Sequence, residues 1–482
     1  MLHARLLFAF CVALTLVAPT LHAADRLPNI VLIVSDDQGY HDLGSFGNKE
    51  IITPNLDRVA KEGVRCTNYY VSWPACTPSR GSILTGRYPQ RNGLYDMIRN
   101  DVADFGRTFT EAEYSVTPER ILGMDTREIM FPEVLKQAGY ATAVFGKWDG
   151  GQLKRYLPLQ RGFDEYFGHV NTGIDYFTHE RYSYPSMYRD NYMTTEDKGT
   201  YCTDLFRREA LRFVRNQQDK PFFLYLPFNA PHGASNLDPK IRGAAQAPEK
   251  FKAMYPKYQA DEGYQKGTRY GKEAMVPNRA KRKLEYLGAV TCMDAAIGDV
   301  LNLLDELKLA DNTLVIFFSD NGGSGGADNT PLSGHKGQMR EGGIRVPFVA
   351  RFPGRIPAGT VSHEFLTSLE LFPTFTKLVG QKLPAGVIYD GHDMLPVLTG
   401  KQKSQRTEMF WQRRADKAAR IGHYKWVDAK TGSGVYDLKN DIGEKHDLTK
   451  ERPELAARLK ARFEAWRKAM DETEPRGPFR DF

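Results

Sequence analysis

Cysteine is scarce in this sequence. Its 482 residues include five cysteines, and no two of them form a Cys-x-x-Cys pair. Zinc clusters and disulfide-stapled scaffolds need closely spaced cysteines, so this spacing argues against both. One lone cysteine, Cys76, nevertheless lies in the distinctive stretch ACTPSRGSILTGR. The local spacing does not explain Cys76, so its role has to be inferred from the other motifs of the chain.

Long apolar runs are also lacking beyond the N-terminus, as are internal repeats and low-complexity tracts. No later stretch is long and apolar enough to cross a membrane. The first residues, by contrast, place Arg5 before a short apolar run that ends at Leu21-His22-Ala23. This layout predicts a secretory signal peptide over residues 1–23. The alternative is an N-terminal membrane anchor, which the shortness of the run disfavours.

We therefore expect the mature chain to be exported, either periplasmic or secreted, without a stable membrane anchor. Cleavage would remove Cys11 and leave four scattered cysteines. No charge of one sign dominates, because the formal net charge is +7. This mild basicity is compatible with an acidic substrate without demonstrating one, and we predict no nucleic-acid partner.

Three short apolar runs end in polar residues: 28–37 (PNIVLIVSDD), 222–233 (FFLYLPFNAPHG) and 312–321 (NTLVIFFSDN). Continuous apolar runs of this length are typical of strands covered on both faces, as in parallel sheets. Helical patterns separate them, notably over residues 281–308 and at the start of residues 131–148, where a further strand follows. This alternation predicts an α/β fold with a large mixed, mostly parallel sheet and helices on both faces.

The composition changes after Phe372. Short strand-like pieces, ARIGHYKWVDA and SGVYDLKND, precede a charged helix, PELAARLKARFEAWRKAMD. We predict a large domain over residues 24–385 and a small C-terminal α+β domain over residues 386–482. Residues 235–283 are polar, irregular and rich in lysine and arginine. This pattern favours a solvated surface insertion, and the alternative is a basic rim for a polyanion.

Polar side chains follow the predicted strands, at the edge where sites form in open parallel sheets. Asp36 and Asp37 follow the first run, and Asp320 and Asn321 follow the third. If these strands are neighbours, three carboxylates and an amide oxygen form a hard pocket that suits Ca²⁺ or Mg²⁺ better than zinc. A single Asp-Asp pair after a strand is more often a helix cap or a turn.

Cationic groups accompany these carboxylates. Arg80, Lys147 and Lys336 each lie in a glycine-punctuated stretch, and His232 follows the second apolar run. Taken singly, each is explained as an ordinary surface charge. Together beside a metal ion, the three cations would bind a tetrahedral oxyanion and neutralise its charge in the transition state.

At these positions the sequence resembles the type I sulfatases. The stretch CTPSRGSILTGR is similar to their signature, Cys-x-Pro-Ser-Arg followed by Leu-Thr-Gly-Arg, and this match is highly specific. Other stretches follow in the family's order: PNIVLIVSDDQGYHDLGSFG, GKW, NAPHG, SDNGG, HKGQMREGGIRVP and VYDLKNDIGEKHDL. The resemblance covers nearly the whole mature chain and implies the fold of the alkaline phosphatase superfamily.

The resemblance also implies a chemistry for Cys76. In the family this cysteine is oxidised to formylglycine before folding, by a maturation enzyme that reads Cys-x-Pro-x-Arg. The hydrated aldehyde attacks sulfur with one hydroxyl, and its second hydroxyl later allows release of the sulfate.

The implied ligands of the divalent cation, usually Ca²⁺ with Mg²⁺ possible, are Asp36, Asp37, Asp320, Asn321 and the modified Cys76. Arg80 would support the diol. Lys147 and Lys336 would contact the sulfate, and His232 would assist departure of the alcohol by general acid catalysis.

One position departs from the family's pattern. The family reads Gly-Lys-Trp-His, and this chain has Asp149 in place of the histidine. That histidine normally hydrogen-bonds the diol and takes its proton, which a carboxylate can also accept. We therefore predict that Asp149 is this proton acceptor. Because Asp149 is two residues from Lys147, both face the same pocket if the strand extends that far. The alternative is a turn in which Asp149 caps a helix or local amides.

The predicted function is hydrolysis of sulfate esters, with a sulfated glycan as the substrate. The stretch RGFDEYFGHVNTGIDYFTHE resembles the N-acetylgalactosamine-4-sulfatase branch and suggests a glycan without naming the sugar. One alternative is a phosphoester or phosphonate hydrolase of the same superfamily, although phosphatases of this fold usually have Ser or Thr at the nucleophile position. Another is an inactive sulfoglycan-binding homologue, against which the full set of metal and cationic positions argues.

Overall fold

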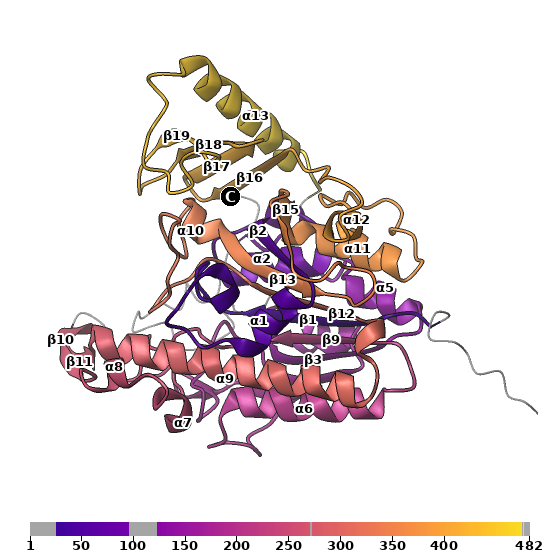
Figure 1. Ribbon diagram of the computed structural model, residues 1–482, viewed down its shortest axis with the longest axis vertical. Coiled ribbons are helices and arrows are strands. Elements are labelled where there is room, and N and C mark those ends of the chain that lie inside the picture. Colours follow the sequence, from indigo (N-terminus) through magenta and orange to yellow (C-terminus); the bar gives the residue numbers. More distant parts are fainter. Residues whose placement is uncertain (1–25, 96–122, 270–271, 475, 477–482) are drawn as a thin grey trace, which may run out of the picture.

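A large mixed sheet forms the centre of the molecule in the computed structural model, which describes residues 26–95, 123–269, 272–474 and 476. The predicted signal peptide lies outside these residues. The sheet has eleven strands in the order β14-β2-β13-β12-β1-β9-β3-β4-β7-β8, with β15 paired to β2 (Figure 1). A smaller four-stranded sheet, β16 to β19, lies towards the C-terminus.

The middle of the large sheet is parallel. It consists of β12 (Thr313–Ser319), β1 (Asn29–Ser35), β9 (Phe222–Pro227), β3 (Ala141–Lys147) and β4 (Glu165–His169). Alternate side chains of β1 belong to two different apolar cores, one on each face of the sheet. A strand buried on both faces needs apolar residues at every position, which is why these runs are continuous in the sequence.

Shorter or antiparallel strands extend the sheet on both sides. β13 pairs antiparallel with both β12 and β2, and β7 pairs antiparallel with β4. Their bounds are β2 (Val64–Tyr70), β13 (Arg345–Arg351), β14 (Thr360–Ser362), β15 (Leu366–Thr367), β7 (Met187–Arg189) and β8 (Tyr192–Met193). A separate two-stranded ribbon joins β5 (Glu180–Arg181) and β6 (Tyr184–Pro185). The predicted mixed, mostly parallel sheet is confirmed.

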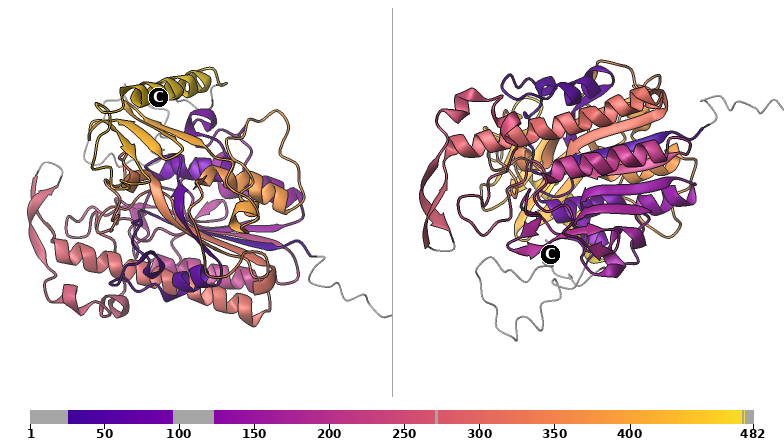
Figure 2. Two further views of the ribbon diagram at one scale, coloured as in Figure 1. Left: turned by 45° about the horizontal axis from the view of Figure 1, so that its top comes forward. Right: turned by 90° about the horizontal axis from the view of Figure 1, so that it is seen from below.

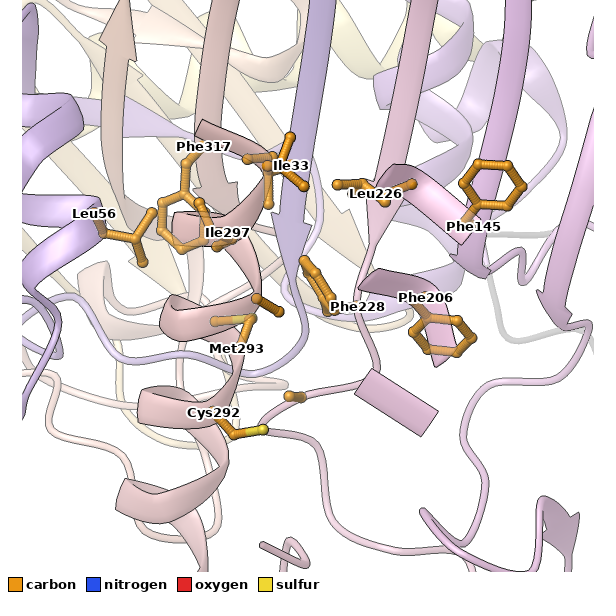
Figure 3. Close-up of a cluster of buried hydrophobic side chains, with 14 of the residues drawn as sticks. Ile33, Leu56, Phe145, Phe206, Leu226, Phe228, Cys292, Met293, Ile297 and Phe317 are labelled. Atoms are coloured by element: carbon orange, nitrogen blue, oxygen red, sulfur yellow. The ribbon is translucent and has the colours of Figure 1, made fainter. Parts of the chain in front are cut away.

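Helices cover both faces of this sheet, as predicted. On one face lie α1 (Pro54–Lys61), α6 (Cys202–Asn216) and α9 (Arg279–Glu306), and their apolar side chains meet those of the strands. Figure 3 shows part of this layer, where Ile33 and Phe317 from the sheet face Met293 and Ile297 of α9. On the other face lie α2 (Cys76–Thr85), α5 (Phe131–Gln137) and α11 (Leu371–Leu378).

Helix α9 corrects one expectation. It is long and apolar enough, by length and composition alone, to pass for a membrane span, although no such stretch was expected. Most of its apolar segment is buried against the sheet and the neighbouring helices, which identifies it as a core helix of the fold. A helix that is apolar on most sides is expected when neighbours surround it.

The C-terminal sheet is antiparallel throughout. It contains β16 (Glu408–Arg413), β17 (Asp416–Ile421), β18 (Tyr424–Asp428) and β19 (Gly434–Asp437), and α13 (Pro453–Asp471) packs on it. The stretch ARIGHYKWVDA is therefore two paired strands with a turn at Gly422, which has a positive φ of 59°. The predicted domain boundary at residues 385/386 stays a prediction.

The basic insertion over residues 235–283 is more regular than predicted. It contains α7 (Glu249–Lys252), α8 (Pro256–Gln259) and a hairpin of β10 (Tyr264–Arg269) and β11 (Lys272–Pro277). The predicted surface insertion is largely exposed, and its two strands were not recognised because no apolar alternation marks them. The short elements are α3 (Pro89–Asn92), α10 (Glu341–Ile344), α12 (Leu395–Leu398), η2 (Gly44–Phe46), η4 (Lys154–Tyr156), η5 (Pro158–Gln160), η6 (Ala310–Asn312) and η7 (Ser368–Glu370).

Candidate active site

The strand ends bring the predicted acidic residues together. Asp36 and Asp37 directly follow β1, and Asp320 and Asn321 directly follow β12. Because β1 and β12 are adjacent, parallel and paired to their last residues, the two polar pairs leave the sheet side by side. All four residues are buried.

Hydrogen bonds join these two strand ends. Asn321 Nδ2 donates to Asp37 Oδ1 at 2.8 Å, and the Asp37 amide donates to Asp320 Oδ1 at 3.3 Å. Asp37 has a φ of 67°, in the left-handed region, which turns the chain sharply after the strand. Two buried oxygens, Asp36 Oδ1 and Asn321 Oδ1, have no hydrogen-bond partner among the described residues.

Helix α2 positions Cys76 and Arg80 against these carboxylates. Cys76 is the first residue of the helix, and Arg80 lies one turn later on the same face. Arg80 Nε donates to Asp320 Oδ2 at 2.9 Å, and Arg80 Nη2 forms ion pairs with Asp320 Oδ2 at 2.8 Å and with Asp36 Oδ2 at 3.7 Å. The Cys76 sulfur and one oxygen each of Asp36 and Asp320 lie within 4.8 Å of one another.

The thiol of Cys76 is not poised to react as it is. Its side chain is buried, with 1% exposed. Burial raises the pKa of Cys76 to about 11, although the charges of Lys147 and Lys336 act in the opposite direction. At neutral pH the group is therefore a neutral thiol, which is a weak nucleophile compared with a thiolate.

Two lysines flank the carboxylates. Lys147, the last residue of β3, places Nζ 2.6 Å from Asp36 Oδ2, and Lys336 places Nζ 2.7 Å from Asp37 Oδ1. Burial alone would lower the pKa of each lysine, but Asp36 raises that of Lys147 and Asp37 raises that of Lys336. Both ammonium groups therefore stay charged at neutral pH.

The three carboxylates have different acidities. Burial raises the pKa of Asp36, against the charges of Lys147 and Arg80. Burial and then the charge of Asp36 raise the pKa of Asp320 to about 6. Burial also opposes ionisation of Asp37, but Lys336 and other neighbours outweigh it and lower its pKa. Crowded carboxylates repel one another strongly where water is excluded.

His232 lies in the loop after β9, on the Asp37 side of the site. Its Nε2 is 3.9 Å from Asp37 Oδ2, and its Nδ1 lies 2.8 Å from the carbonyl oxygen of Gly233. A carbonyl only accepts, so Nδ1 carries the proton in the neutral ring and Nε2 has a lone pair. Burial and then the charge of Lys336 lower the pKa of His232 to about 3.

Asp149 also reaches the site, but not as an extension of the strand. β3 ends at Lys147, and Asp149 has a φ of 54°, in the left-handed region. Its Oδ1 accepts a hydrogen bond from Thr77 Oγ1 at 2.9 Å, and its Oδ2 lies 3.6 Å from Lys147 Nζ. Asp149 is thus a buried carboxylate beside the residue that follows Cys76.

The loop that carries Lys336 is held by the C-terminal sheet. Lys425 of β18 places Nζ 2.9 Å from Glu341 Oε1 and 3.0 Å from Glu444 Oε1. The Glu341 amide donates to Glu444 Oε2 at 2.8 Å, and Arg413 Nη1 donates to the Gly337 carbonyl at 3.0 Å. Contacts from a second sheet therefore fix both sides of a loop that contributes to the site.

Sequence reasoning missed two residues of this region. His169 ends β4 and pairs in register with Lys147, and both ring nitrogens are buried without a hydrogen-bond partner among the described residues. Burial and then the charge of Lys147 lower its pKa. Ser324 Oγ donates to Asp37 Oδ2 at 3.0 Å. The rule that sites follow parallel strands would have found His169, whereas no local pattern marks Ser324.

The geometry agrees with the class of protein that the sequence predicts. A mostly parallel sheet carries, at its carboxyl edge, paired acidic residues, convergent cations and a helix whose first residue faces them. This arrangement fits the alkaline phosphatase superfamily fold that the resemblance implies, and solved sulfatase structures share it.

The chain belongs to the sulfatase family, whose family model matches residues 28–381. A second family model, "N-sulphoglucosamine sulphohydrolase, C-terminal", matches residues 335–469. The protein is therefore a sulfatase, an enzyme that hydrolyses sulfuric esters. The predicted family and enzyme class are confirmed.

Three relatives illustrate the similarity. The N-acetylgalactosamine-6-sulfatase of Canis lupus familiaris is 34% identical, covering 83% of this chain and 72% of its own length. The steryl-sulfatase of Homo sapiens is 30% identical, covering 80% and 72%. The crystal structure of Ps i-CgsB in complex with k-i-k-neocarrahexaose has a TM-score of 0.78 at 30% identity, covering 95% of both chains. The likeness to the N-acetylgalactosamine-4-sulfatase branch stays a prediction.

Proposed function

We propose that this sulfatase is exported and removes sulfate from a sulfated glycan, with Cys76 converted to formylglycine. The observation that carries the proposal is the place of Cys76, whose sulfur lies beside oxygens of Asp36 and Asp320. The glycan class is supported by relatives named for N-acetylgalactosamine sulfate and by the neocarrahexaose in the Ps i-CgsB complex. The predicted signal peptide supports export to the periplasm or beyond.

The residues present fit a hard divalent cation. Asp36 Oδ1 and Asn321 Oδ1 are buried acceptors without a hydrogen-bond partner in the described part of the chain. Oxygen donors of this kind suit Ca²⁺ or Mg²⁺. Asp36, Asp37, Asp320 and Asn321 would hold the ion, and the modified residue 76 would complete its ligands. The ion would supply positive charge at the reacting oxygens, and hydrated formylglycine would supply the attacking hydroxyl.

The lysines would hold the sulfate in line with residue 76. Lys147 and Lys336 each contact a carboxylate, and an ammonium group has three N–H donors, so further donors remain for sulfate oxygens. Their positive charges would offset the charge that develops on those oxygens in the transition state. Arg80, fixed to Asp320, would keep residue 76 oriented.

His232 would act on the departing alcohol. Its Nε2 can donate only when the ring is protonated, because Nδ1 already holds the proton of the neutral ring. The pKa of about 3 must therefore rise on substrate binding. An anionic sulfate ester bound beside the ring has this effect, because an opposite charge favours the protonated form.

Maturation would have to precede folding. In the folded chain Cys76 is 1% exposed, and the Cys-x-Pro-x-Arg stretch is helical and buried. The proposed partner is therefore a formylglycine-generating enzyme that acts on the extended Cys-x-Pro-x-Arg stretch.

The test compares matched esters. Aryl sulfate and aryl phosphate with the same alcohol are incubated with the enzyme, together with carrageenan- and chondroitin-type hexasaccharides, and Cys76→Ser serves as the control. Sulfate release from the aryl ester and from at least one hexasaccharide is expected, with little phosphate release. Preferential phosphate release would indicate a phosphoester hydrolase, and binding of a hexasaccharide without any turnover would indicate an inactive binding protein.

A further inference from the structure

A cavity lies at the base of the β10–β11 hairpin, outside the site described above. Its volume is about 430 Å³, within the range of ligand-binding pockets. Its walls come from the hairpin, from residues 240–249 and from the first turns of α9. Tyr264, Lys240 and Lys281 line it.

The chemistry of the lining suits an anionic sugar. Tyr264 is 45% exposed. The Nζ atoms of Lys240 and Lys281 lie 5.8 and 5.5 Å from the centroid of its ring. An aromatic face can pack against the C–H groups of a sugar ring, while adjacent ammonium groups meet its sulfate or carboxylate.

One of these lysines has no carboxylate partner among the described residues. Lys281 lies 3.3 Å from Glu262 and 3.4 Å from Glu285, whereas Lys240 makes no ion pair with any described residue. The carboxylate of Glu285 is itself engaged, because it also accepts from the Ala247 amide at 2.8 Å. Lys240 contacts the ring of Tyr264 but no carboxylate, so its ammonium group can still pair with an anion.

The cavity lies at the same edge of the sheet as the active site. Helix α9 leads through a short connection into β12, so its first turns lie near the carboxyl end of that strand. Tyr286 OH donates to Asp42 Oδ2 at 2.6 Å, and Lys283 Nζ donates to the Gly326 carbonyl at 2.9 Å. These contacts tie the start of α9 to the loops after β1 and β12. Figures 1 and 2 show the hairpin at this end of α9.

A single residue connects the cavity wall to the catalytic loop. The Tyr176 amide donates to Gln246 Oε1 at 2.8 Å, and Gln246 lines the cavity. The hydroxyl of the same Tyr176 donates to the His232 carbonyl at 2.7 Å. The cavity is thus one buried tyrosine away from the loop that carries His232.

We propose that this cavity is a subsite for a second anionic sugar unit of the glycan, with Tyr264 as the stacking face and Lys240 and Lys281 as the cationic contacts. The proposal rests on the proposed function, since it extends the binding of the same substrate. In this proposal the basic insertion recognises the length of the glycan, whereas the candidate active site hydrolyses the ester.

The experiment measures two kinds of substrate on the same variants. For Tyr264→Ala and Lys240→Ala, we measure KM for an aryl sulfate, and we measure inhibition of that reaction by the carrageenan- and chondroitin-type hexasaccharides. The concentration giving half-inhibition is expected to rise about 5- to 10-fold for the best hexasaccharide. KM and kcat for the aryl sulfate are expected to stay unchanged, because the cavity lies outside the reacting centre. Tyr264→Phe keeps the ring and is expected to match the parent.

Matched controls make the result decisive. Tyr192→Ala removes a tyrosine that is 75% exposed on β8, at the far end of the strand order, and Lys382→Ala removes an exposed lysine elsewhere. Equal hexasaccharide inhibition in the cavity variants, the controls and the parent would overturn the subsite. So would a parent enzyme that neither hexasaccharide inhibits. Turnover of the aryl sulfate shows separately whether the sulfatase chemistry stands.

Discussion

Cys76 is held in place by its helix more than by contacts of its sulfur. The residue before it is extended, Cys76 begins α2, and Arg80 one turn later is bonded to Asp320. The side chain therefore reaches the strand ends with little freedom. A substitution that preserves its size is expected to change the chemistry and leave the fold intact.

We predict that Cys76 becomes formylglycine when the chain is made beside a competent maturation system. Mass spectrometry of the tryptic peptide Cys66–Arg80 is expected to show the aldehyde. Fully active enzyme that carries only the thiol would refute this mechanism. Cys76→Ser is expected to lose turnover with a nearly unchanged melting temperature, because a serine hydroxyl offers no second hydroxyl on the same carbon.

A turn, and not an extension of strand β3, brings the Asp149 carboxylate to the candidate site. The alternation of a strand cannot place it, because β3 ends at Lys147. Its left-handed backbone and the hydrogen bond from Thr77 bring the carboxylate next to residue 76 instead. Among the described residues, the Asp149 carboxylate contacts the side chains of Thr77 and Lys147, and not the backbone amides that the capping alternative requires.

We predict that Asp149→Asn lowers kcat about 100-fold, the usual effect of losing a general base. Asparagine keeps the acceptor for Thr77 but has no basicity at neutral pH. Rapid-mixing kinetics are expected to show a burst of alcohol followed by slow turnover. A rate and pH profile identical to those of the parent would reject the catalytic role.

Individual site residues could be predicted where a simple rule applies. Asp36, Asp320 and His232 follow continuous apolar runs, and the topology of parallel sheets brings such positions to one edge. Ser324 could not be found in this way, because only the folded loop brings its hydroxyl to a carboxylate. The protonation state of His232 was also beyond the sequence, since it depends on burial and on a lysine about 100 residues away.

At the scale of elements, the paired ends of β1 and β12 gather carboxylates that repel one another. Lysines and an arginine offset part of this repulsion, yet Asp320 keeps a raised pKa. A cation between the strand ends would stabilise the fold as well as the reaction, because it binds only the folded arrangement.

We predict that chelation lowers activity and thermal stability together. Dialysis against EDTA is expected to lower the melting temperature and abolish most turnover, and Ca²⁺ or Mg²⁺ is expected to restore both. A metal-free preparation, verified by elemental analysis, that retained full turnover would show that the assignment of Asp36, Asp37, Asp320 and Asn321 is wrong.

Buried strands could be predicted from the sequence, whereas exposed strands could not. The interior positions of β1, β9 and β12 are apolar because both faces are covered, so these strands were recognised. The hairpin of β10 and β11 was missed because water contacts both of its faces and leaves no period-2 pattern. Propensity alone does not distinguish such exposed strands from loops.

At the scale of the whole molecule, the C-terminal sheet supports the loop that carries Lys336 to the candidate site. Lys425 is fully buried between Glu341 and Glu444, next to the loop that carries Lys336. Removing one partner of a buried ion pair leaves charge uncompensated and costs more than the pair contributes.

We predict that Lys425→Met destabilises the protein by about 3 kcal/mol and also lowers kcat. Urea unfolding measures the first effect and aryl sulfate turnover the second. Lys430→Met, which alters an exposed lysine after the same strand, is the matched control and is expected to change neither. Full stability and activity in Lys425→Met would contradict the proposed support of the loop.

The same network predicts a response to acid. Burial opposes ionisation of Glu341, but Lys425 and other cations lower its pKa to about 2. A carboxyl with a lowered folded-state pKa contributes stability above its unfolded pKa of about 4.3 and loses it as the pH falls through the folded value. Unfolding measured between pH 5 and 2 is expected to show this loss, and Glu341→Gln is expected to weaken the dependence.

The contacts that support the Lys336 loop come from residues that are synthesised late. Glu444 leaves the ribosome about 370 residues after Cys76, which corresponds to roughly 20–70 s at typical elongation rates. Until then the support of that loop is missing. The late synthesis of Glu444 therefore delays closure of the site around Cys76. If Cys76 is modified before folding, as proposed, this delay is the time in which a maturation enzyme can reach it.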